Sequence, residues 1–503
     1  MAPLKDILDD TLDALERSTR SLSFAPRVEQ QGVVLSYSDG VAAVSGLGDV
    51  ENEEIVRFDT GAEGLVLDLL PDAVGIVVLS GYESVGAGSR VMRTGLTLSV
   101  PVGEGLIGRV VDPLAKPLDE RGPVESDERM PVERKAPGVL KREPVTVPLH
   151  TGIKVIDAMI PIGRGQRELI VGDRSIGKTA IAVDTVQNQR DTNVVCVYVA
   201  VGQKAANIGR VVKALREHGA MDYTVVVASD AEDPPGLKYI APYAGCAIAE
   251  YFRDRGGDAL IVYDDLTRHA DAYREISLLL KRPPGREAYP GDIFYIHSRL
   301  LERAARLDEK SGGGSLTALP IVETQAGNIS AFIPTNLISI TDGQIYLESK
   351  LFRQGQLPAV DTGRSVSRVG GKTQLPAVKD VAGRLRLDYN QYLELEYFTR
   401  FGARIDESTR KSLERGKRIQ QVLRQPPNEP RPIAEQVAVF TAASAGALDA
   451  LDPDRVSAFE TAFRTRFRKE RPDTASRIEE GESLSDEDRD AIVSLAKEVA
   501  GET

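Results

Sequence analysis

Eight consecutive residues, 172–179, match the pattern G-x-x-x-x-G-K-[ST] of loops that bind nucleotide phosphates. Residues 168–171 predict a short buried strand before this loop, and residues 179–183 begin a helical pattern after it. Glycines let backbone N–H groups point at phosphates, and the N-terminus of the following helix attracts negative charge. Together these features favour nucleotide binding over a glycine-rich turn without a ligand. The predicted binding residues are Gly172, Asp173, Arg174, Ser175, Ile176, Gly177, Lys178 and Thr179, with Lys178 on the β- and γ-phosphates and Thr179 on Mg²⁺.

A second predicted strand, residues 259–263, ends in two carboxylates, Asp264 and Asp265. Beside a phosphate-binding loop, the first of them is expected to hold Mg²⁺ through water. A neighbouring predicted strand leads to Gln203, where a hydrolase needs a group that orients or deprotonates the attacking water. Some GTPases position water with glutamine, but a neutral amide cannot accept the proton as a carboxylate does. The residues therefore predict slow or absent hydrolysis.

Arg368 lies in a glycine-flanked segment, residues 365–371, after the last strand expected in the nucleotide-binding part. An arginine on such a loop can act as an arginine finger, which neutralises charge on a γ-phosphate during its transfer. A surface salt bridge is an equally good interpretation of this residue taken alone. Asp342 and Gln344 have no chemical role that their neighbours in the sequence suggest.

Composition excludes several classes of protein. The chain has 503 residues, 42% hydrophobic and 27% charged, which predicts a folded protein of about three domains. A net charge of −12 argues against a large nucleic-acid interface, and four scattered histidines argue against a zinc site. Cys196 and Cys246 lie in apolar runs and are expected to be buried, reduced thiols. Without an apolar run long enough to cross a bilayer, and with Asp9 and Asp10 near the N-terminus, the chain is expected to be intracellular.

Patterning divides the chain into four parts. Residues 1–31 contain an amphipathic helix, 4–18, which needs either a partner or the rest of its own chain to cover its apolar face. Residues 32–99 alternate as short strands and predict a small β-barrel, with an Asp39-Gly40 hairpin turn. Residues 100–378 alternate strands, among them 194–201, 223–228 and 259–263, with helices. Residues 379–503 are helical.

The fold class predicted is therefore an α/β P-loop nucleotide domain with an N-terminal small β-barrel and a C-terminal helical domain. In the helical part, Asp452 and Pro453 form a predicted helix start, and Ser485 with Asp488 forms a predicted capping box.

Several longer motifs carry a resemblance to a known family. Over about residues 30–500 the chain resembles the α subunits of F-type ATP synthases, whose nucleotide domain is RecA-like. The motifs are found at residues 161–169, 282–292, 297–303, 323–327, 341–344 and 365–371.

The resemblance implies a noncatalytic, regulatory subunit that binds Mg²⁺ with ATP or ADP. It implies that Gln203 stands where the catalytic β subunit has glutamate, and that Arg368 is inserted as a finger into the adjacent β site. Pro358 and Gln425 are expected beside the adenine. The implied partners are β subunits in an alternating α₃β₃ ring, the γ central stalk, and the δ or peripheral-stalk subunit through the N-terminal helix. The membrane sector, which moves H⁺ or Na⁺, is reached indirectly, and no nucleic acid is expected. The implied location is peripheral, on the cytoplasmic side of a bacterial or archaeal membrane.

The chain departs from the family pattern in four places. Ser175-Ile176 replaces Gln-Thr in the phosphate loop, Leu357 replaces arginine before Pro358, Pro427 replaces the second adenine-side glutamine, and Arg268-His269 replaces Lys-Gln. The first three touch the nucleotide pocket, so they predict altered affinity. These departures indicate a divergent α subunit of an accessory ATPase.

Two other functions use a similar layout. An autonomous hexameric ATPase, such as a secretion motor or a catalytic β-type subunit, would need a carboxylate at position 203 and has Gln203 instead. A hexameric RNA helicase would need basic and aromatic residues in its barrel, whereas residues 32–95 are acid-rich with few aromatics.

Overall fold

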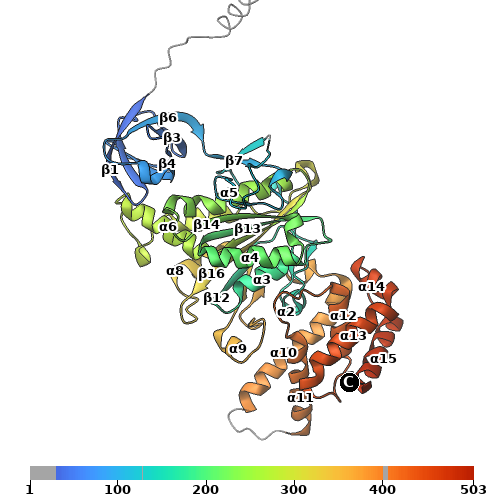
Figure 1. The fold of residues 1–503 in the computed structure, drawn as a ribbon. Coiled ribbons are helices and arrows are strands. Elements are labelled where there is room, and N and C mark those ends of the chain that lie inside the picture. Colours follow the sequence, from blue (N-terminus) through green and yellow to red (C-terminus); the bar gives the residue numbers. More distant parts are fainter. Residues whose placement is uncertain (1–29, 127, 400–405, 503) are drawn as a thin grey trace, which may run out of the picture. The chain divides into compact units, whose positions relative to one another are not determined.

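The computed structural model describes residues 30–126, 128–399 and 406–502 of the chain. These residues divide into two compact units, one within residues 30–96 and one formed by residues 38–41 and 97–502 (Figure 1). The amphipathic helix predicted at residues 4–18 lies outside the described residues. Along the chain a β-barrel is followed by an α/β domain and then by helices, which confirms the predicted fold class.

The first unit is a closed barrel of six strands in the order β1-β2-β5-β4-β3-β6. Alternating apolar side chains such as Val34, Val44 and Val91 fill its interior and are almost completely buried. The predicted hairpin turn is confirmed, because Asp39 and Gly40 both have positive φ between β1 and β2. The strands are β1 (Gln31–Ser38), β2 (Val41–Ser45), β3 (Glu54–Phe58), β4 (Glu63–Leu69), β5 (Val74–Ser80) and β6 (Arg90–Thr97).

The centre of the second unit is an eight-stranded sheet in the order β18-β17-β12-β16-β15-β13-β14-β8. All neighbouring pairs are parallel except β17 with β18. The strands predicted at 194–201, 223–228 and 259–263 are confirmed. The sheet consists of β8 (Val110–Val111), β12 (Leu169–Asp173), β13 (Val194–Gln203), β14 (Thr224–Asp230), β15 (Asp258–Asp264), β16 (Ser315–Thr324), β17 (Gly343–Tyr346) and β18 (Val366–Ser367).

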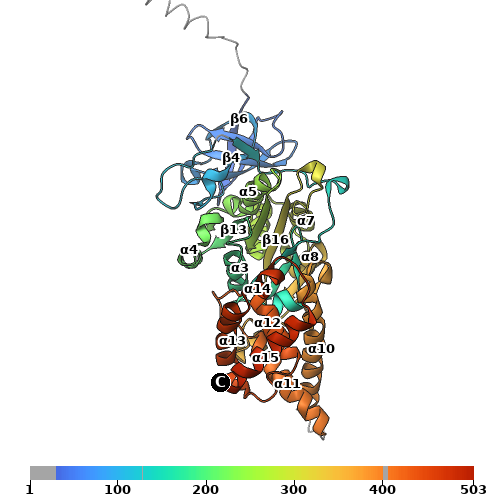
Figure 2. The same ribbon diagram turned by 90° about the vertical axis from the view of Figure 1, so that its right-hand side faces the viewer.

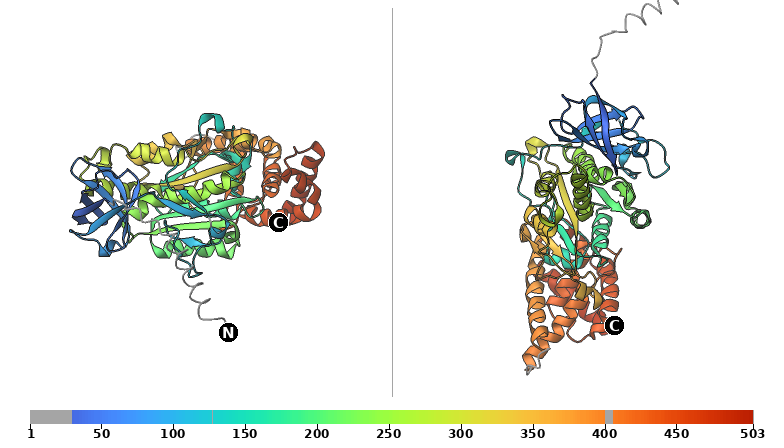
Figure 3. Two further views of the ribbon diagram at one scale, coloured as in Figure 1. Left: turned by 90° about the horizontal axis from the view of Figure 1, so that it is seen from above. Right: turned by 90° about the vertical axis from the view of Figure 1, so that its left-hand side faces the viewer.

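Helices cover both faces of this sheet (Figures 1 and 3). The connections through α3 and α4 run one way along the strand order, and those through α5, α6 and α8 run back. Because parallel crossovers are right-handed, opposite directions place the two groups on opposite faces, and both faces of the strands become apolar. These helices are α3 (Lys178–Gln187), α4 (Ala205–Glu217), α5 (Pro235–Arg253), α6 (Leu266–Leu279), α7 (Ile293–Leu301) and α8 (Phe332–Ile340).

A helical domain follows the last strand of the sheet (Figure 2). Its central helix α12 is buried along its whole length, and Phe459, Phe463 and Phe467 stack at successive turns of α13. The capping box is confirmed: Ser485 Oγ accepts from Asp488 N at 3.0 Å and donates to the Asp488 carboxylate at 2.7 Å. The helices are α10 (Pro376–Thr399), α11 (Glu407–Leu423), α12 (Ile433–Ser444), α13 (Val456–Glu470), α14 (Pro472–Glu479) and α15 (Asp486–Glu502).

Short elements join these layers. Asp452 caps a 3₁₀ turn, Pro453–Arg455, that runs into α13. The predicted helix start is therefore confirmed, with one 3₁₀ turn preceding the α-helix. Cys196 and Cys246 are buried free thiols, as predicted. None of the described helices is both long and apolar enough to cross a membrane. The remaining described strands and α-helices are β7 (Ser99–Val102), β9 (Glu128–Pro131), β10 (Pro148–Leu149), β11 (Ile162–Gly163), α2 (Lys154–Met159) and α9 (Ser349–Arg353).

Candidate nucleotide-binding site

The predicted phosphate loop joins β12 to α3 at the carboxyl edge of the sheet. Its backbone requires two left-handed residues, Ser175 with φ 62° and Gly177 with φ 103°. A Cβ on Gly172 would lie 2.7 Å from Ile176 Cδ1 and 2.9 Å from the Leu347 carbonyl oxygen, so only glycine fits there. The first turn of α3 begins directly at Lys178, and its free N–H groups face the loop.

Lys178 lies folded over this loop and is 6% exposed. Its ammonium group donates to the carbonyl oxygens of Gly172 at 2.9 Å and Asp173 at 2.6 Å. Burial lowers the pKa of Lys178, while the carboxylates of Glu323, Asp265 and Asp264 act in the opposite direction. The ammonium is thus held at the loop by neutral backbone acceptors. A charged phosphate oxygen is a stronger acceptor and can replace them.

Two residues of the loop have structural roles that their position in the motif did not indicate. The Asp173 carboxylate accepts from Thr324 Oγ1 at 2.7 Å, Gly327 N at 2.8 Å and Ser349 Oγ at 2.7 Å, which ties the loop to β16 and α9. Ile176 is 5% exposed and belongs to the hydrophobic core. Its additional bulk is therefore accommodated in the core and leaves the phosphate side of the loop unobstructed.

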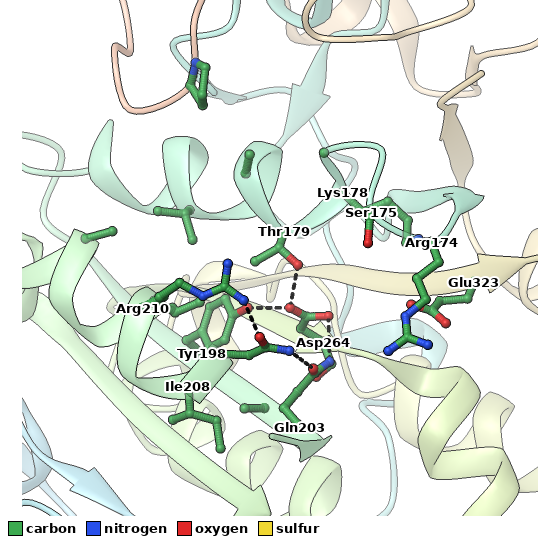
Figure 4. Close-up of a pocket in the computed structure, with 18 of the residues that line it drawn as sticks. Arg174, Ser175, Lys178, Thr179, Tyr198, Gln203, Ile208, Arg210, Asp264 and Glu323 are labelled. Carbon is green, nitrogen blue, oxygen red and sulfur yellow. Dashed lines mark hydrogen bonds between the residues drawn. The ribbon is translucent and has the colours of Figure 1, made fainter. Parts of the chain in front are cut away.

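Asp264 is the last residue of β15, opposite the loop, and its carboxylate accepts hydrogen bonds from three side chains (Figure 4). Its Oδ2 accepts from Thr179 Oγ1 at 2.8 Å and from Tyr198 Oη at 2.6 Å. The Gln203 amide donates to Oδ1 over 3.4 Å. Burial raises the pKa of Asp264, whereas the hydrogen bonds from Tyr198 and Thr179 lower it. The fold thus brings Gln203 and Asp264 to Thr179, although they lie 24 and 85 positions after it along the chain.

A pocket of about 480 Å³ opens between the loop, α3 and α4. This volume is within the usual range for small-molecule sites. Arg210, which the motifs did not single out, points from α4 toward Asp264 (Figure 4). Its guanidinium donates to Asn207 Oδ1, and the Asn207 amide donates to Gln203 Oε1 at 3.4 Å. The lining consists of Arg174, Ser175, Gly177, Lys178, Thr179, Ala180, Val183, Tyr198, Ala200, Gln203, Asn207, Ile208, Arg210, Val211, Ala214, Asp264, Arg268, Glu323, Pro427 and Asn428.

The far end of this pocket differs from the expectation for an adenine site. Pro427 and Asn428 line it, whereas Pro358 and Gln425 do not. The Gln425 amide is 4% exposed, donates to the carbonyl oxygens of Gly152 and Glu429 at 2.8 Å each, and accepts from Lys154 N at 3.1 Å. All of its polar atoms are engaged with backbone. Gln425 therefore fastens the segment before α12 to the segment before α2.

Arg368 follows β18 at the edge of the sheet and does not line the pocket of its own chain. Its backbone N donates to Asp342 O at 2.8 Å, and its guanidinium donates to Thr341 O at 3.4 Å. The long guanidinium contact restrains the side chain only weakly. Asp342, for which the sequence suggested no role, binds Arg167 in a bidentate ion pair with distances of 3.0 and 2.8 Å.

Helices α6 and α7 each contribute one residue to a buried histidine pair, His269 from α6 and His297 from α7. His269 and His297 are both fully buried, with 3.3 Å between Nδ1 of the first and Nε2 of the second. His269 Nε2 lies 3.0 Å from Tyr239 O, and since a carbonyl only accepts, this nitrogen carries the proton. Burial lowers the pKa of His269 to about 4.

This burial predicts an acid-sensitive fold. The unfolded chain binds a proton at His269 below about pH 6.5, but the folded chain resists it until about pH 4. The free energy of unfolding should therefore fall as the pH drops through this window, by on the order of 3 kcal/mol for this residue. Urea unfolding of wild type and His269→Gln between pH 4 and 7 measures this, and the variant should show the shallower slope. Equal slopes would contradict the attribution of this pH dependence to His269.

Fold and site together define a P-loop nucleotide-binding protein with a barrel before its sheet and a helical domain after it. Three family models match the chain: the beta-barrel domain of the ATP synthase alpha/beta family over residues 27–95, its nucleotide-binding domain over 152–367, and its C-terminal domain over 374–499. The chain belongs to this family.

Curated relatives agree over almost the whole length. The chain is 56% identical to ATP synthase subunit alpha 2 of Albidiferax ferrireducens over 94% of this chain and 89% of the relative. It is 53% identical to subunit alpha 2 of Syntrophus aciditrophicus over 98% and 95%, and 54% identical to subunit alpha of Petrotoga mobilis over 95% and 96%. The predicted resemblance to α subunits is confirmed.

Proposed function

We propose that this chain is the noncatalytic, regulatory α subunit of a rotary F-type ATP synthase or ATPase. In this proposal it binds Mg-ATP or Mg-ADP in its own pocket and supplies Arg368 to the adjacent catalytic β site. The complex couples ATP synthesis or hydrolysis to transport of H⁺ or Na⁺ across a membrane. The observation that carries the proposal is Gln203: the phosphate loop and Asp264 are in place, but the residue beside them is an amide.

The oxygen donors at the loop fit a magnesium ion. Thr179 Oγ1 and Asp264 Oδ2 lie 2.8 Å apart, and hydroxyl, carboxylate and water oxygens are the ligands that Mg²⁺ prefers. Thr179 would hold the ion directly and Asp264 through water. When bound, the ion neutralises charge on the β- and γ-phosphates. Tyr198 would keep the Asp264 carboxylate aligned, because its hydroxyl donates to the same oxygen.

The position of Arg368 supports a role in trans. It lies on the β17–β18 edge of the sheet rather than among the pocket residues, so it is unavailable to a nucleotide bound by its own chain. A guanidinium with one long hydrogen bond is free to extend toward a neighbouring subunit.

The assembly proposed is the alternating α₃β₃ ring around γ, with δ or the peripheral stalk at the N-terminal helix. The complex would then lie on the cytoplasmic side of a bacterial or archaeal membrane, in contact with the membrane sector only through other subunits. At the base end of the pocket we assign Pro427 and Asn428 in place of Pro358 and Gln425. Relatives named subunit alpha 2 support an accessory, second ATPase. The boundaries at residues 31, 99 and 378 stay predictions.

Mg-ATPase activity of the isolated chain, and again after assembly with β and γ, tests the proposal. No turnover by the isolated chain and rapid turnover by the complex are expected. Turnover by the isolated chain that disappears on Lys178→Ala would instead favour the autonomous ATPase, with Gln203 sufficient to position water.

Nucleotide binding can be tested separately from turnover. Lys178→Ala should weaken Mg-ATP binding by the isolated chain by about 10-fold or more, because it removes a charged hydrogen bond worth about 1.5–3 kcal/mol. Isothermal titration calorimetry measures the change. Lys213→Ala, on the exposed side of α4, is the matched control and should bind as wild type does. If both variants bind Mg-ATP with equal affinity, Lys178 does not contact the nucleotide.

A further inference from the structure

The residue before β12, Glu168, is a buried acid with one oxygen unpaired. Its side chain has no exposed surface. Oε2 accepts from Gln166 Nε2 at 2.7 Å, whereas Oε1 has no hydrogen-bond partner among the described residues. Burying a charged carboxylate with one unpaired oxygen is costly in free energy, which favours the neutral, protonated form. Burial raises the pKa of Glu168 well above its usual range.

Glu168 packs directly against β17 and against β18, the strand that Arg368 follows. A Cβ on Gly343, the first residue of β17, would lie 2.6 Å from Oε2 and 2.9 Å from Oε1. The same Cβ would lie 2.2 Å from Val366 O in β18. Since Gly343 pairs with Ser367, the carboxyl group lies under the backbone that precedes Arg368.

Gln166 connects the carboxyl group to that backbone. Its Oε1 accepts from Gly163 N at 2.8 Å, which fixes the orientation of the amide. Both hydrogens of Nε2 then point to acceptors, Glu168 Oε2 at 2.7 Å and Ser367 Oγ at 3.2 Å. Ser367 Oγ itself donates to Pro161 O at 2.8 Å. A hydrogen-bonded path thus runs from Glu168 to the residue before Arg368.

Two charged groups act on Glu168 from the elements packed against it. Asp342, before β17, raises the pKa of Glu168, and Arg368, after β18, lowers it. The nearby Arg167 is engaged with Asp342 and Glu302. Among the described residues whose charges shift the pKa of Glu168, Arg368 is therefore the cation.

We propose that Glu168 is a positioning residue for Arg368 and that its protonation decides where the guanidinium lies. This inference rests on the proposed role of Arg368 as a finger for a neighbouring subunit. With its proton, Glu168 is neutral and leaves Arg368 free to extend from the loop. Without its proton, the buried Glu168 carboxylate draws the Arg368 guanidinium back toward β17 and β18. Ionisation of Glu168 withdraws the finger.

The test is the pH dependence of ATP turnover by the assembled complex between pH 6 and 9.5. An acid is neutral below its pKa, so wild type should lose turnover on the alkaline side, by up to about 10-fold per pH unit once Glu168 ionises. Glu168→Gln keeps a neutral side chain of the same shape and should retain turnover there, with near wild-type turnover at pH 6.5. Glu302→Gln, a partner of Arg167 in the same cluster, is the matched control and should keep the wild-type alkaline decline.

Arg368→Ala separates this inference from the proposed function. If that variant turns over normally, the finger role fails. If it is slow but Glu168→Gln shows the wild-type alkaline decline, the inference is overturned and the finger stands. Should Glu168→Gln not assemble, Gln166→Met gives a second test: it removes a hydrogen bond to the ionised form, so the decline should move to higher pH. An unmoved decline would overturn the inference.

Discussion

Replacing Arg368 with alanine should lower ATP turnover by the assembled complex by about 10³-fold or more while the complex still assembles. In the proposed role, the Arg368 guanidinium places positive charge on a transferring phosphoryl group in a neighbouring subunit. Its loss removes stabilisation that exists only in the transition state, so kcat should fall with little change in nucleotide binding by this chain's own pocket. Steady-state turnover and gel filtration of the purified complex measure both quantities.

Arg364→Ala is the matched control for that experiment. Arg364 lies four residues earlier on the same segment, with a side chain 57% exposed beside Asp361. It carries the same charge, but its guanidinium is engaged with Tyr346 Oη at 3.2 Å. We expect turnover within about 3-fold of wild type for this variant, since exposed ion pairs contribute little. Equal loss in both variants would indicate a general effect of charge at the loop and would refute the finger.

The second large effect expected is on stability, at an ion pair that joins the nucleotide domain to the helical domain. Lys154 in α2 and Glu460 in α13 are 2% and 7% exposed, and the ammonium lies 2.7 and 2.6 Å from the two carboxylate oxygens. Burial lowers the pKa of Lys154, and Glu460 counteracts this. Lys154→Met would leave the carboxylate buried without its cation and should cost about 3–5 kcal/mol in the free energy of unfolding.

Chemical unfolding of the isolated chain measures this loss, with two further variants as controls. Lys411→Met breaks a pair whose side chains are 79% and 84% exposed, and it should change the free energy of unfolding by less than about 0.5 kcal/mol. The double variant Lys154→Met with Glu460→Leu removes both charges and should recover most of the lost stability. A double variant as unstable as the single one would show that packing, rather than the unpaired charge, dominates.

Local sequence was sufficient for the phosphate loop, the barrel and the capping box. The loop is formed by eight consecutive residues whose backbone conformation depends on residue types at fixed spacing, so the motif was sufficient to predict it. The Asp39-Gly40 turn and the Ser485–Asp488 box are likewise made by residues within a few positions of one another. Gln203 and Asp264 could be placed because strands in a parallel sheet end at a common edge.

Other roles depended on contacts between distant parts of the chain. Lys154 and Glu460 are 306 positions apart, and the Arg167–Asp342 pair spans 175. Gln425 and Asp173 were predicted to bind the cofactor, which stays a prediction, and the sequence did not indicate that their side chains brace the backbone and the loop. Side-chain direction at such positions is decided by which distant surface packs against them, and no local pattern records it.

The chemistry of nucleotide binding was thus encoded in short motifs, where the backbone itself supplies the geometry. Tertiary structure alone decided that Asn428 lines the pocket, that Ile176 turns into the core, and that Glu168 is buried beneath the strands before Arg368. The physical reason is that burial and electrostatic coupling are properties of the packed molecule. Nothing in the sequence around Glu168 indicates that it is buried or that the distant Arg368 acts on its carboxyl group; both depend on the folded chain.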